Sequence, residues 1–300
     1  MRLTGPPWNT LVDVDALAAA LDAAALRGEA AGAAPDPPLR ILDARFSLAD
    51  PAAGAAQHAA GHLPGAVHAD LDRDLSDLRR PGQGRHPLPD SDAFAATLGR
   101  WGIGADTQVV VHDAADGSMA AARAWWLLRL MGHTRVAVLD GGIAAWTRAG
   151  RPLTTATCEV PALPAYPGRF DMRQVVGCDA ILARLGDAPG WLLDARAGER
   201  FRGEVEPLDP VAGHVPGAVN HPLALNVADG RLRPADALRA ALRQAIGAYD
   251  PSQVVVMCGS GVTACHLLLA MEVAGLPGAR VHAGSWSAWI EDRTRPVARG

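Results

Sequence analysis

The residue of this chain best suited to act as a nucleophile is Cys258, which ends an apolar run and opens the glycine-rich segment CGSGVTAC. Gly259 and Gly261 would let the backbone curl so that successive amide N–H groups face inward and bind an anion. A helix beginning near Thr263 would add the partial positive charge of its N-terminus. Because the thiolate is the nucleophilic form of cysteine, this setting predicts a reactive thiol, although free cysteines are more often simply buried.

The other three cysteines give no sign of a metal site or a disulfide framework. Cys158, Cys178 and Cys265 form no C-x-x-C pair with Cys258 or with one another, so a structural zinc site is not expected. Cys265 follows Cys258 by about two helical turns. Core packing is therefore a better interpretation of Cys265 than a role as a resolving thiol.

Four sequence blocks recur in the same order in the two halves of the chain. ILDARF returns as LLDARAGERF, GHLPGAVH as GHVPGAVN, QVVVHDAADGSMAAARA as QVVVMCGSGVTACHLLL, and VLDGGIAAWTRAGRP more loosely as VHAGSWSAWIEDRTRP. So long a period indicates a duplicated domain, because solenoid repeats span only ~20–50 residues. In the third block Asp113 occupies the position of Cys258, which predicts one active and one silent copy.

The elements that would position Cys258 alternate between short β-branched runs and longer helical stretches. Strands are expected at 39–42, 109–111 and 136–139, then at 192–193, 254–257 and 280–282, with helices at 121–131 and 263–274. This alternation predicts an α/β fold of two tandem domains, each a mainly parallel central sheet flanked by helices. We expect a non-catalytic domain at 1–152, a linker at 153–173 and a catalytic domain at 174–300. Cys258 would lie beyond the carboxyl end of a strand, where such sheets bind ligands.

The active loop CGSGVTAC, the exchange of cysteine for Asp113, and the motifs LDAR, GH-[LV]-PGAV and AGSWSAW together resemble one family. They are similar to the tandem-domain rhodanese superfamily, and within it to the 3-mercaptopyruvate and thiosulfate sulfurtransferases. The resemblance implies two rhodanese-like domains and a persulfide carried on Cys258. The implied reaction moves sulfane sulfur from 3-mercaptopyruvate to a small thiol, a protein thiol or cyanide, without a metal or organic cofactor. Thiosulfate is the alternative donor, and a sulfur-relay or interaction module is the alternative to an enzyme.

The same resemblance implies roles for the residues around the nucleophile. Arg200, in GERFRG, would anchor the anionic end of the donor. The family usually has a second arginine shortly after, in an E-P-R context, where this chain has Leu208. The donor would also be held by the loop that follows the nucleophile, namely Gly259, Gly261, Val262 and Thr263.

Some family members use a relay of aspartate, histidine and serine, with the serine two positions after the cysteine. Ser260 and His62 match that pattern, and Asp50 is the candidate for the third member. The alternative interpretation of His62, and of its counterpart His214, is that each organises the turn G-H-x-P-G-A.

The loop composition bears on the choice of donor. Gly259 and Ser260 are neutral, which favours the monoanionic 3-mercaptopyruvate over the dianionic thiosulfate, whereas Leu208 argues the other way.

A cysteine phosphatase would need an arginine after five intervening residues, to clamp the phosphate. That position is Ala264, so phosphatase chemistry is not expected.

Composition sets the remaining limits. The chain has 300 residues, 49% hydrophobic and 20% charged, and a net charge of −4, which is typical of a globular protein without affinity for nucleic acid. All 28 basic residues are arginines, which excludes a lysine Schiff base. Apolar runs stay below the ~18 residues of a membrane span, and the N-terminus does not have the pattern of a signal peptide. We therefore expect a cytoplasmic location and no membrane partner.

Overall fold

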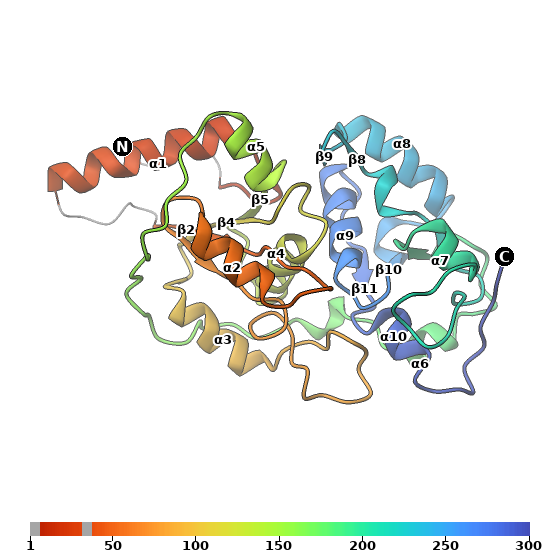
Figure 1. Ribbon diagram of the computed structural model, residues 1–300. Coiled ribbons are helices and arrows are strands. Elements are labelled where there is room, and N and C mark those ends of the chain that lie inside the picture. The colour runs from red at the N-terminus through yellow and green to blue at the C-terminus, as the bar shows by residue number, and fades with distance from the viewer. Residues whose placement is uncertain (1–6, 32–37) are drawn as a thin grey trace. The chain divides into compact units, whose positions relative to one another are not determined.

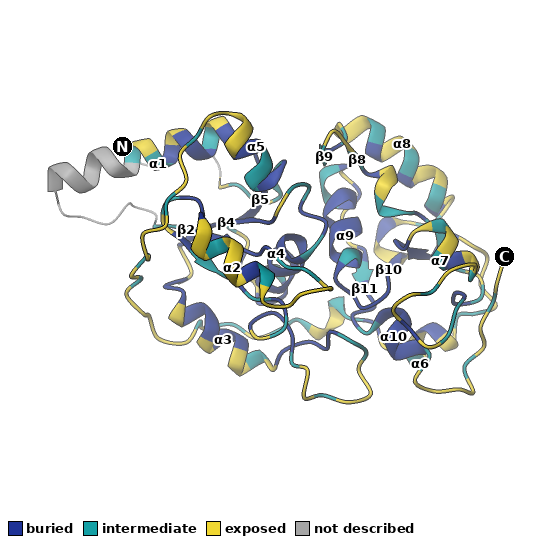
Figure 2. Ribbon diagram, viewed as in Figure 1, coloured by how far each residue is buried: buried dark blue, intermediate teal, exposed yellow. Residues whose placement is uncertain are grey.

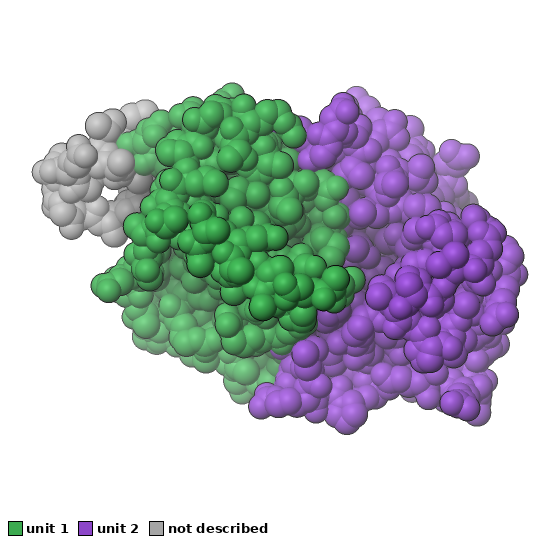
Figure 3. Space-filling view, in the orientation of Figure 1, with its two compact units in different colours: residues 1–75, 89–170 green, residues 76–88, 171–300 purple. Residues whose placement is uncertain are grey.

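The computed structural model describes residues 7–31 and 38–300 (Figure 1). The chain divides into two compact units, shown in different colours in Figure 3. The first comprises residues 1–75 and 89–170, and the second comprises residues 76–88 and 171–300. The segment 76–88 comes from the middle of the predicted first domain but packs with the second unit.

The first unit is built on a parallel sheet with the strand order β1-β5-β4-β2-β3. Its central strand, QVVVH, is buried at every residue (Figure 2), as expected of a parallel strand that is covered on both faces. The strands are β1 (Leu11–Val12), β2 (Leu39–Asp43), β3 (Ala66–His68), β4 (Gln108–His112) and β5 (Val136–Leu139). The helices are α1 (Val14–Ala31), α2 (Ala53–Ala60), α3 (Ser91–Arg100), α4 (Ala120–Leu130) and α5 (Gly142–Arg148).

The second unit repeats this design with the parallel strand order β11-β10-β6-β7 and a small antiparallel pair, β8-β9. The strands are β6 (Leu192–Asp194), β7 (Val219–Asn220), β8 (Val227–Ala228), β9 (Arg231–Leu232), β10 (Val255–Met257) and β11 (Arg280–Val281). The α-helices are α6 (Cys178–Leu182), α7 (Gly198–Arg202), α8 (Ala235–Ile246), α9 (Thr263–Val273) and α10 (Ser285–Trp289). Short 3₁₀ helices lie at Met172–Gln174, Leu223–Leu225 and Pro251–Gln253.

The duplication extends to individual hydrogen bonds. In the first unit Arg45 bonds Asp43 and donates to the Gly61 carbonyl at 2.7 Å. In the second unit Arg196 bonds Asp194 and donates to the Gly213 carbonyl at 2.9 Å. Each LDAR arginine thus ties the end of a strand to the turn before the next strand, which is a structural role.

The predicted fold class is confirmed, since both units are mainly parallel sheets flanked by helices. Each predicted strand and helix occurs, and no end differs from the prediction by more than one residue. The strands β3 and β7, which begin within the two PGAV motifs, were not predicted, and neither were the two-residue strands β1, β8 and β9. Among the described residues, no helix is both long and apolar enough to cross a membrane.

Candidate active site

Cys258 lies directly after β10, the strand flanked by β11 and β6, and its side chain is buried. The Gly261 N–H donates a hydrogen bond to Cys258 Sγ over 3.1 Å. Gly261 has a φ of +81°, and a Cβ atom there would lie 2.0 Å from the Ala283 carbonyl oxygen. Only glycine fits this position, because both the left-handed backbone and the close approach exclude a side chain. The helix α9 then begins at Thr263.

A turn at the start of α10 holds the backbone of this loop. The buried Cys258 N–H donates to Ser285 Oγ at 3.0 Å, and Ser285 Oγ donates to the His282 carbonyl at 2.8 Å. The Trp286 N–H donates to the Cys258 carbonyl at 3.0 Å, and the Ser287 N–H donates to the Gly259 carbonyl at 2.9 Å. We call residues 285–287 the α10 turn. It satisfies three backbone groups of the loop and so fixes the position of the thiol.

Ser260 is hydrogen-bonded to a histidine that the sequence argument did not select. His86 Nδ1 and Ser260 Oγ lie 2.7 Å apart, and both side chains are buried. His86 belongs to the segment 76–88 of the second unit. A hydroxyl paired with an imidazole can pass a proton, so this pair can act as a short relay beside Cys258.

Two guanidinium groups face the residue after the nucleophile. A Cβ atom at Gly259 would lie 3.3 Å from Arg85 Nη2 and 3.5 Å from both Arg200 Nη1 and Nη2. Arg85 precedes His86 on the same segment, and its backbone N–H donates to Ser287 Oγ at 2.9 Å. Arg85 Nε is buried and has no hydrogen-bond partner among the described residues. The space above Gly259 is therefore lined with N–H donors suited to an anion.

Two carboxylates balance these arginines. Arg200 Nη2 donates to Glu206 Oε1 at 2.6 Å and to Asp209 Oδ2 at 3.2 Å. Arg85 Nη1 donates to Asp209 Oδ1 at 2.5 Å. Burial raises the pKa of Asp209, against the lowering effect of Arg85. Because two cations face two anions, the site offers directed hydrogen bonds with little net positive charge.

Leu208 lies beside this cluster but is 44% exposed. Its backbone N–H donates to Glu206 Oε1 at 3.1 Å. Leu208 has no guanidinium group to offer. The second guanidinium of the site comes instead from Arg85, which is distant in the sequence.

The two remaining residues of the predicted relay lie in the first unit. His62 Nδ1 contacts the His58 carbonyl at 2.8 Å, and His62 Nε2 contacts the Ala156 carbonyl at 3.2 Å. Asp50 precedes α2, is exposed, and accepts a hydrogen bond from the Ala52 N–H at 3.0 Å. These contacts are those of turn-forming residues, and the histidine bonded to Ser260 is His86.

His86 and Arg85 were missed because the stretch DLRRPGQGRHPLP has no periodicity and no counterpart in the repeat. The available signal was an Arg-His pair inside a long loop rich in glycine and proline, since functional residues are frequent on such loops. That signal alone could not have indicated the partners Ser260 and Gly259.

The loop that follows β4 in the first unit holds a carboxyl group where the second unit has the thiol of Cys258. Asp113 follows β4, and its carboxylate accepts hydrogen bonds from the N–H groups of Ala115, Gly117 and Met119 at 3.0–3.2 Å. Burial is the main cause that raises the pKa of Asp113 to about 6. The carboxylate thus occupies a backbone cradle comparable to the one around Cys258 Sγ.

Comparison with known proteins agrees with this geometry. The model of the rhodanese-like domain matches twice, at residues 26–149 and 179–292. A relative from Pseudomonas aeruginosa, named as a probable 3-mercaptopyruvate sulfurtransferase, is 47% identical over 269 residues, which cover 88% of this chain and 94% of that protein. Thiosulfate sulfurtransferase of Gallus gallus is 32% identical over 255 residues, covering 84% and 86%. The crystal structure of SseA from Escherichia coli, described as a 3-mercaptopyruvate sulfotransferase, superposes with a TM-score of 0.76 at 32% identity, covering 93% and 99%.

The chain belongs to the rhodanese-like family, with two copies of its domain. Within that family it is an enzyme of the sulfurtransferase class. The relatives that carry this name align with it over most of their length.

Proposed function

We propose that this chain transfers sulfane sulfur from 3-mercaptopyruvate to a thiol or cyanide through a persulfide on Cys258. The observation that carries the proposal is the arrangement around one loop. Cys258 Sγ receives the Gly261 N–H, while Arg85 and Arg200 face Gly259, the next residue. A nucleophile and a pair of carboxylate-binding groups are thereby held side by side.

In the first half-reaction the Cys258 thiolate attacks the sulfur of the donor. An S–S bond forms, the C–S bond of the donor breaks, and the electrons of that bond leave on the enolate of pyruvate. The proton of the donor's thiol reaches this enolate through Ser260 and His86, giving pyruvate. In the second half-reaction an acceptor thiol, a protein thiol or cyanide removes the outer sulfur, so that kinetics are ping-pong.

The charge of the site supports 3-mercaptopyruvate as the donor. Arg85 and Arg200 are already paired with Glu206 and Asp209, so a dianion would gain little from net charge. A monoanionic carboxylate can instead use the N–H donors that face Gly259. Thiosulfate is the second candidate, because a relative named for that activity also aligns over most of the chain.

The decisive experiment combines mass spectrometry with kinetics. After treatment with 3-mercaptopyruvate the intact protein should gain one sulfur, located on Cys258, and Cys258→Ser should gain none. Label on Cys158, Cys178 or Cys265 would contradict the proposed mechanism.

In parallel assays at neutral pH, kcat/KM should be higher for 3-mercaptopyruvate, and a higher value for thiosulfate would reverse the choice of donor. The double variant Gly259→Arg, Ser260→Lys should then move the preference toward thiosulfate.

The organisation of the chain and its location complete the proposal. We take residues 1–152 as the non-catalytic domain, 153–173 as the linker and 174–300 as the catalytic domain, with 76–88 contributing Arg85 and His86 to the site. Among the described residues the four cysteines form no disulfide, which fits a reducing compartment such as the cytoplasm.

A further inference from the structure

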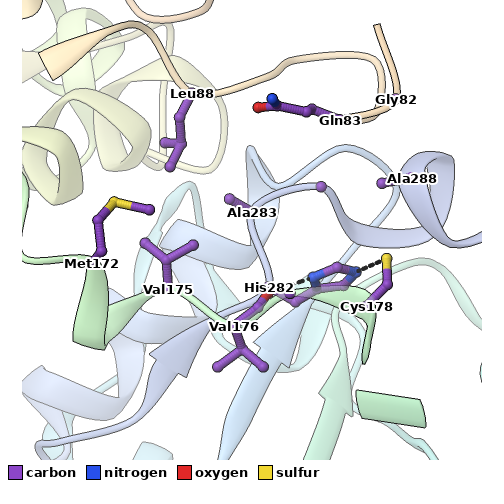
Figure 4. A pocket seen from close by; sticks show the side chains of 12 residues that line it. Gly82, Gln83, Leu88, Met172, Val175, Val176, Cys178, His282, Ala283 and Ala288 are labelled. Carbon is purple, nitrogen blue, oxygen red and sulfur yellow. Dashed lines mark hydrogen bonds between the residues drawn. The ribbon is translucent and has the colours of Figure 1, made fainter. Parts of the chain in front are cut away.

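A second thiol of the second unit lines a pocket bordered by residues 282–284, which directly precede the α10 turn. The pocket has a volume of about 200 Å³ (Figure 4). Its wall is largely apolar and holds no Arg, Asp or Glu side chain. The apolar side chains are Leu88, Met172, Val175, Val176, Ala283 and Ala288. Such a wall favours a small uncharged molecule over an ion.

The polar side chains in this wall are those of Gln83, Cys178 and His282, and the Cys178 thiol and the His282 imidazole point toward each other in Figure 4. Cys178 Sγ and His282 Nε2 lie 3.7 Å apart. His282 Nδ1 lies 2.8 Å from the Val176 carbonyl, which can only accept, so Nδ1 carries the hydrogen. His282 Nε2 is then an acceptor, and the Cys178 S–H donates to it.

Burial keeps this pair neutral. It raises the pKa of the Cys178 thiol and lowers the pKa of His282 to about 4. Cys178 is nevertheless partly exposed, unlike Cys258 and Cys265. The thiol is therefore accessible but protonated in the resting pocket, so its reaction depends on transfer of the proton to His282 Nε2 during the addition.

The pocket shares its wall with the machinery around Cys258. His282, Ala283 and Gly284 lead into the α10 turn, whose Ser285 receives the Cys258 N–H and donates to the His282 carbonyl. On the opposite wall, Gly82 and Gln83 precede Arg85 and His86. A molecule bound at Cys178 would therefore press on both segments that position the nucleophile, the anion site and the relay.

We propose that Cys178 is a modification site for small, uncharged, soft electrophiles, of the α,β-unsaturated carbonyl class, with His282 accepting the thiol proton. In the addition, sulfur bonds to the β-carbon and the electrons of the C=C bond move to the α-carbon. The proton passes from the thiol through His282 Nε2 to that α-carbon, so no oxidant or leaving group is needed. The adduct lowers sulfur transfer by displacing the shared wall.

The chemical part of the proposal is tested in the Cys258→Ser chain, independently of catalysis. N-ethylmaleimide serves as the neutral reagent and iodoacetate as the anionic one, with peptide mass mapping of each cysteine over time. Cys158, which is also partly exposed, is the matched control thiol. The ratio of maleimide rate to iodoacetate rate should be at least about tenfold higher at Cys178 than at Cys158. Equal ratios at the two thiols, or maleimide on Cys158 alone, would overturn the site.

The role of His282 has its own variant. His282→Asn retains a donor for the Val176 carbonyl and removes the acceptor that faces Cys178, so maleimide addition at Cys178 should slow about tenfold. An unchanged rate in a folded variant would refute proton transfer to His282. If this buried substitution prevents folding, the comparison of reagents on the unchanged chain still decides the site.

The effect on activity is tested in the otherwise unmodified chain. Cys258 is first capped reversibly with sulfonatoethyl methanethiosulfonate, a small anionic reagent, and the cap is verified by mass. N-ethylmaleimide is then added, the cap is removed with dithiothreitol, and sulfur transfer is assayed. Activity should fall at least fivefold, whereas Cys178→Ser taken through the same steps should keep its activity. Full activity in the chain labelled at Cys178 would refute the coupling. If untreated enzyme turns over neither donor, the proposed function has failed. The coupling is then tested by whether modification of Cys178 changes the rate at which Cys258 is alkylated.

Discussion

At the scale of single residues, the site depends on hydrogen-bond donors placed around a sulfur atom and not on a strong local charge. The Gly261 N–H bonds Cys258 Sγ, while Arg85 and Arg200 face the neighbouring glycine with their charge already balanced. Directed donors in a buried site stabilise an anion without the desolvation of a free charge pair. The individual side chains can therefore be tested one at a time.

Arg85 should contribute to donor binding as much as Arg200. Replacing either with alanine should lower kcat/KM for 3-mercaptopyruvate by ~10–100-fold, mainly through KM, if one charge-assisted bond of ~1.5–3 kcal/mol is lost. Arg79→Ala is the matched control, because Arg79 lies on the same segment but forms an exposed pair with Asp77. Alkylation of Cys258 by neutral iodoacetamide should hardly change in any of these variants. If it slowed in parallel with turnover, the arginines would be holding the loop and not the donor.

The relay distinguishes between two histidines. His86→Asn should lower kcat by ~10²–10³-fold with little change in KM, because a lost proton relay affects the chemical step. His62→Asn should leave kcat unchanged and lower the free energy of unfolding by ~1–3 kcal/mol, since its ring nitrogens lie 2.8 and 3.2 Å from two backbone carbonyls and its N–H donates to one of them. Steady-state kinetics and denaturant titration of both variants provide the comparison. Loss of kcat in His62→Asn alone would support the relay through His62 that the sequence predicts.

At the scale of elements, the loop of Cys258 is held by a turn that is distant in the sequence. Ser285 has a φ of +52°, an unfavourable conformation for a residue other than glycine. Its hydroxyl nevertheless connects the Cys258 N–H to the His282 carbonyl. We infer that this strain is retained because the buried N–H of the nucleophile needs an acceptor.

Two substitutions separate the strain at Ser285 from its hydrogen bond. Ser285→Ala should destabilise the fold by ~1–3 kcal/mol, because the Cys258 N–H is left buried without a partner. Ser285→Gly removes the same bond but relieves the strained backbone, and should recover roughly 1 kcal/mol relative to alanine. Both should slow the alkylation of Cys258 and sulfur transfer, measured with the free energy of unfolding. Normal sulfur transfer in both variants would show that the turn stabilises the fold without positioning the thiol.

At the scale of the whole molecule, the repeat determined how much could be predicted from the sequence. Strands such as β4 and β10 contain continuous apolar runs, which predict buried parallel strands. Because the same pattern occurs in both copies, each copy supports the prediction made for the other. Cys258 stood out because Asp113 takes its place in the other copy. The segment 76–88 has no such pattern, since its position depends on contacts with Asp209, Ser260 and Ser287 that are far away in the chain. Arg85 and His86 therefore required the structure.

The duplication also predicts a pH dependence of stability that originates in the silent copy. The pKa of Asp113 is raised from 3.8 to about 6 in the folded chain, chiefly by burial. The folded state therefore binds this proton more tightly than the unfolded state does. The resulting stabilisation is complete below pH ~4, is lost as the pH rises through about 6, and amounts to roughly 2–3 kcal/mol.

Asp113→Asn removes this titration, so the stability of the wild-type chain relative to the variant should fall between pH ~4 and ~6 and level off above ~7. Chemical denaturation across that range measures the difference directly. Asp106→Asn, which removes a carboxylate at an exposed position of the same unit, is the control variant. A flat difference for Asp113→Asn would mean that the three backbone N–H donors, which lower the pKa of Asp113, offset the effect of its burial. In that case the loop after β4 would hold an ionised carboxylate wherever the unfolded chain does, that is, above about pH 4.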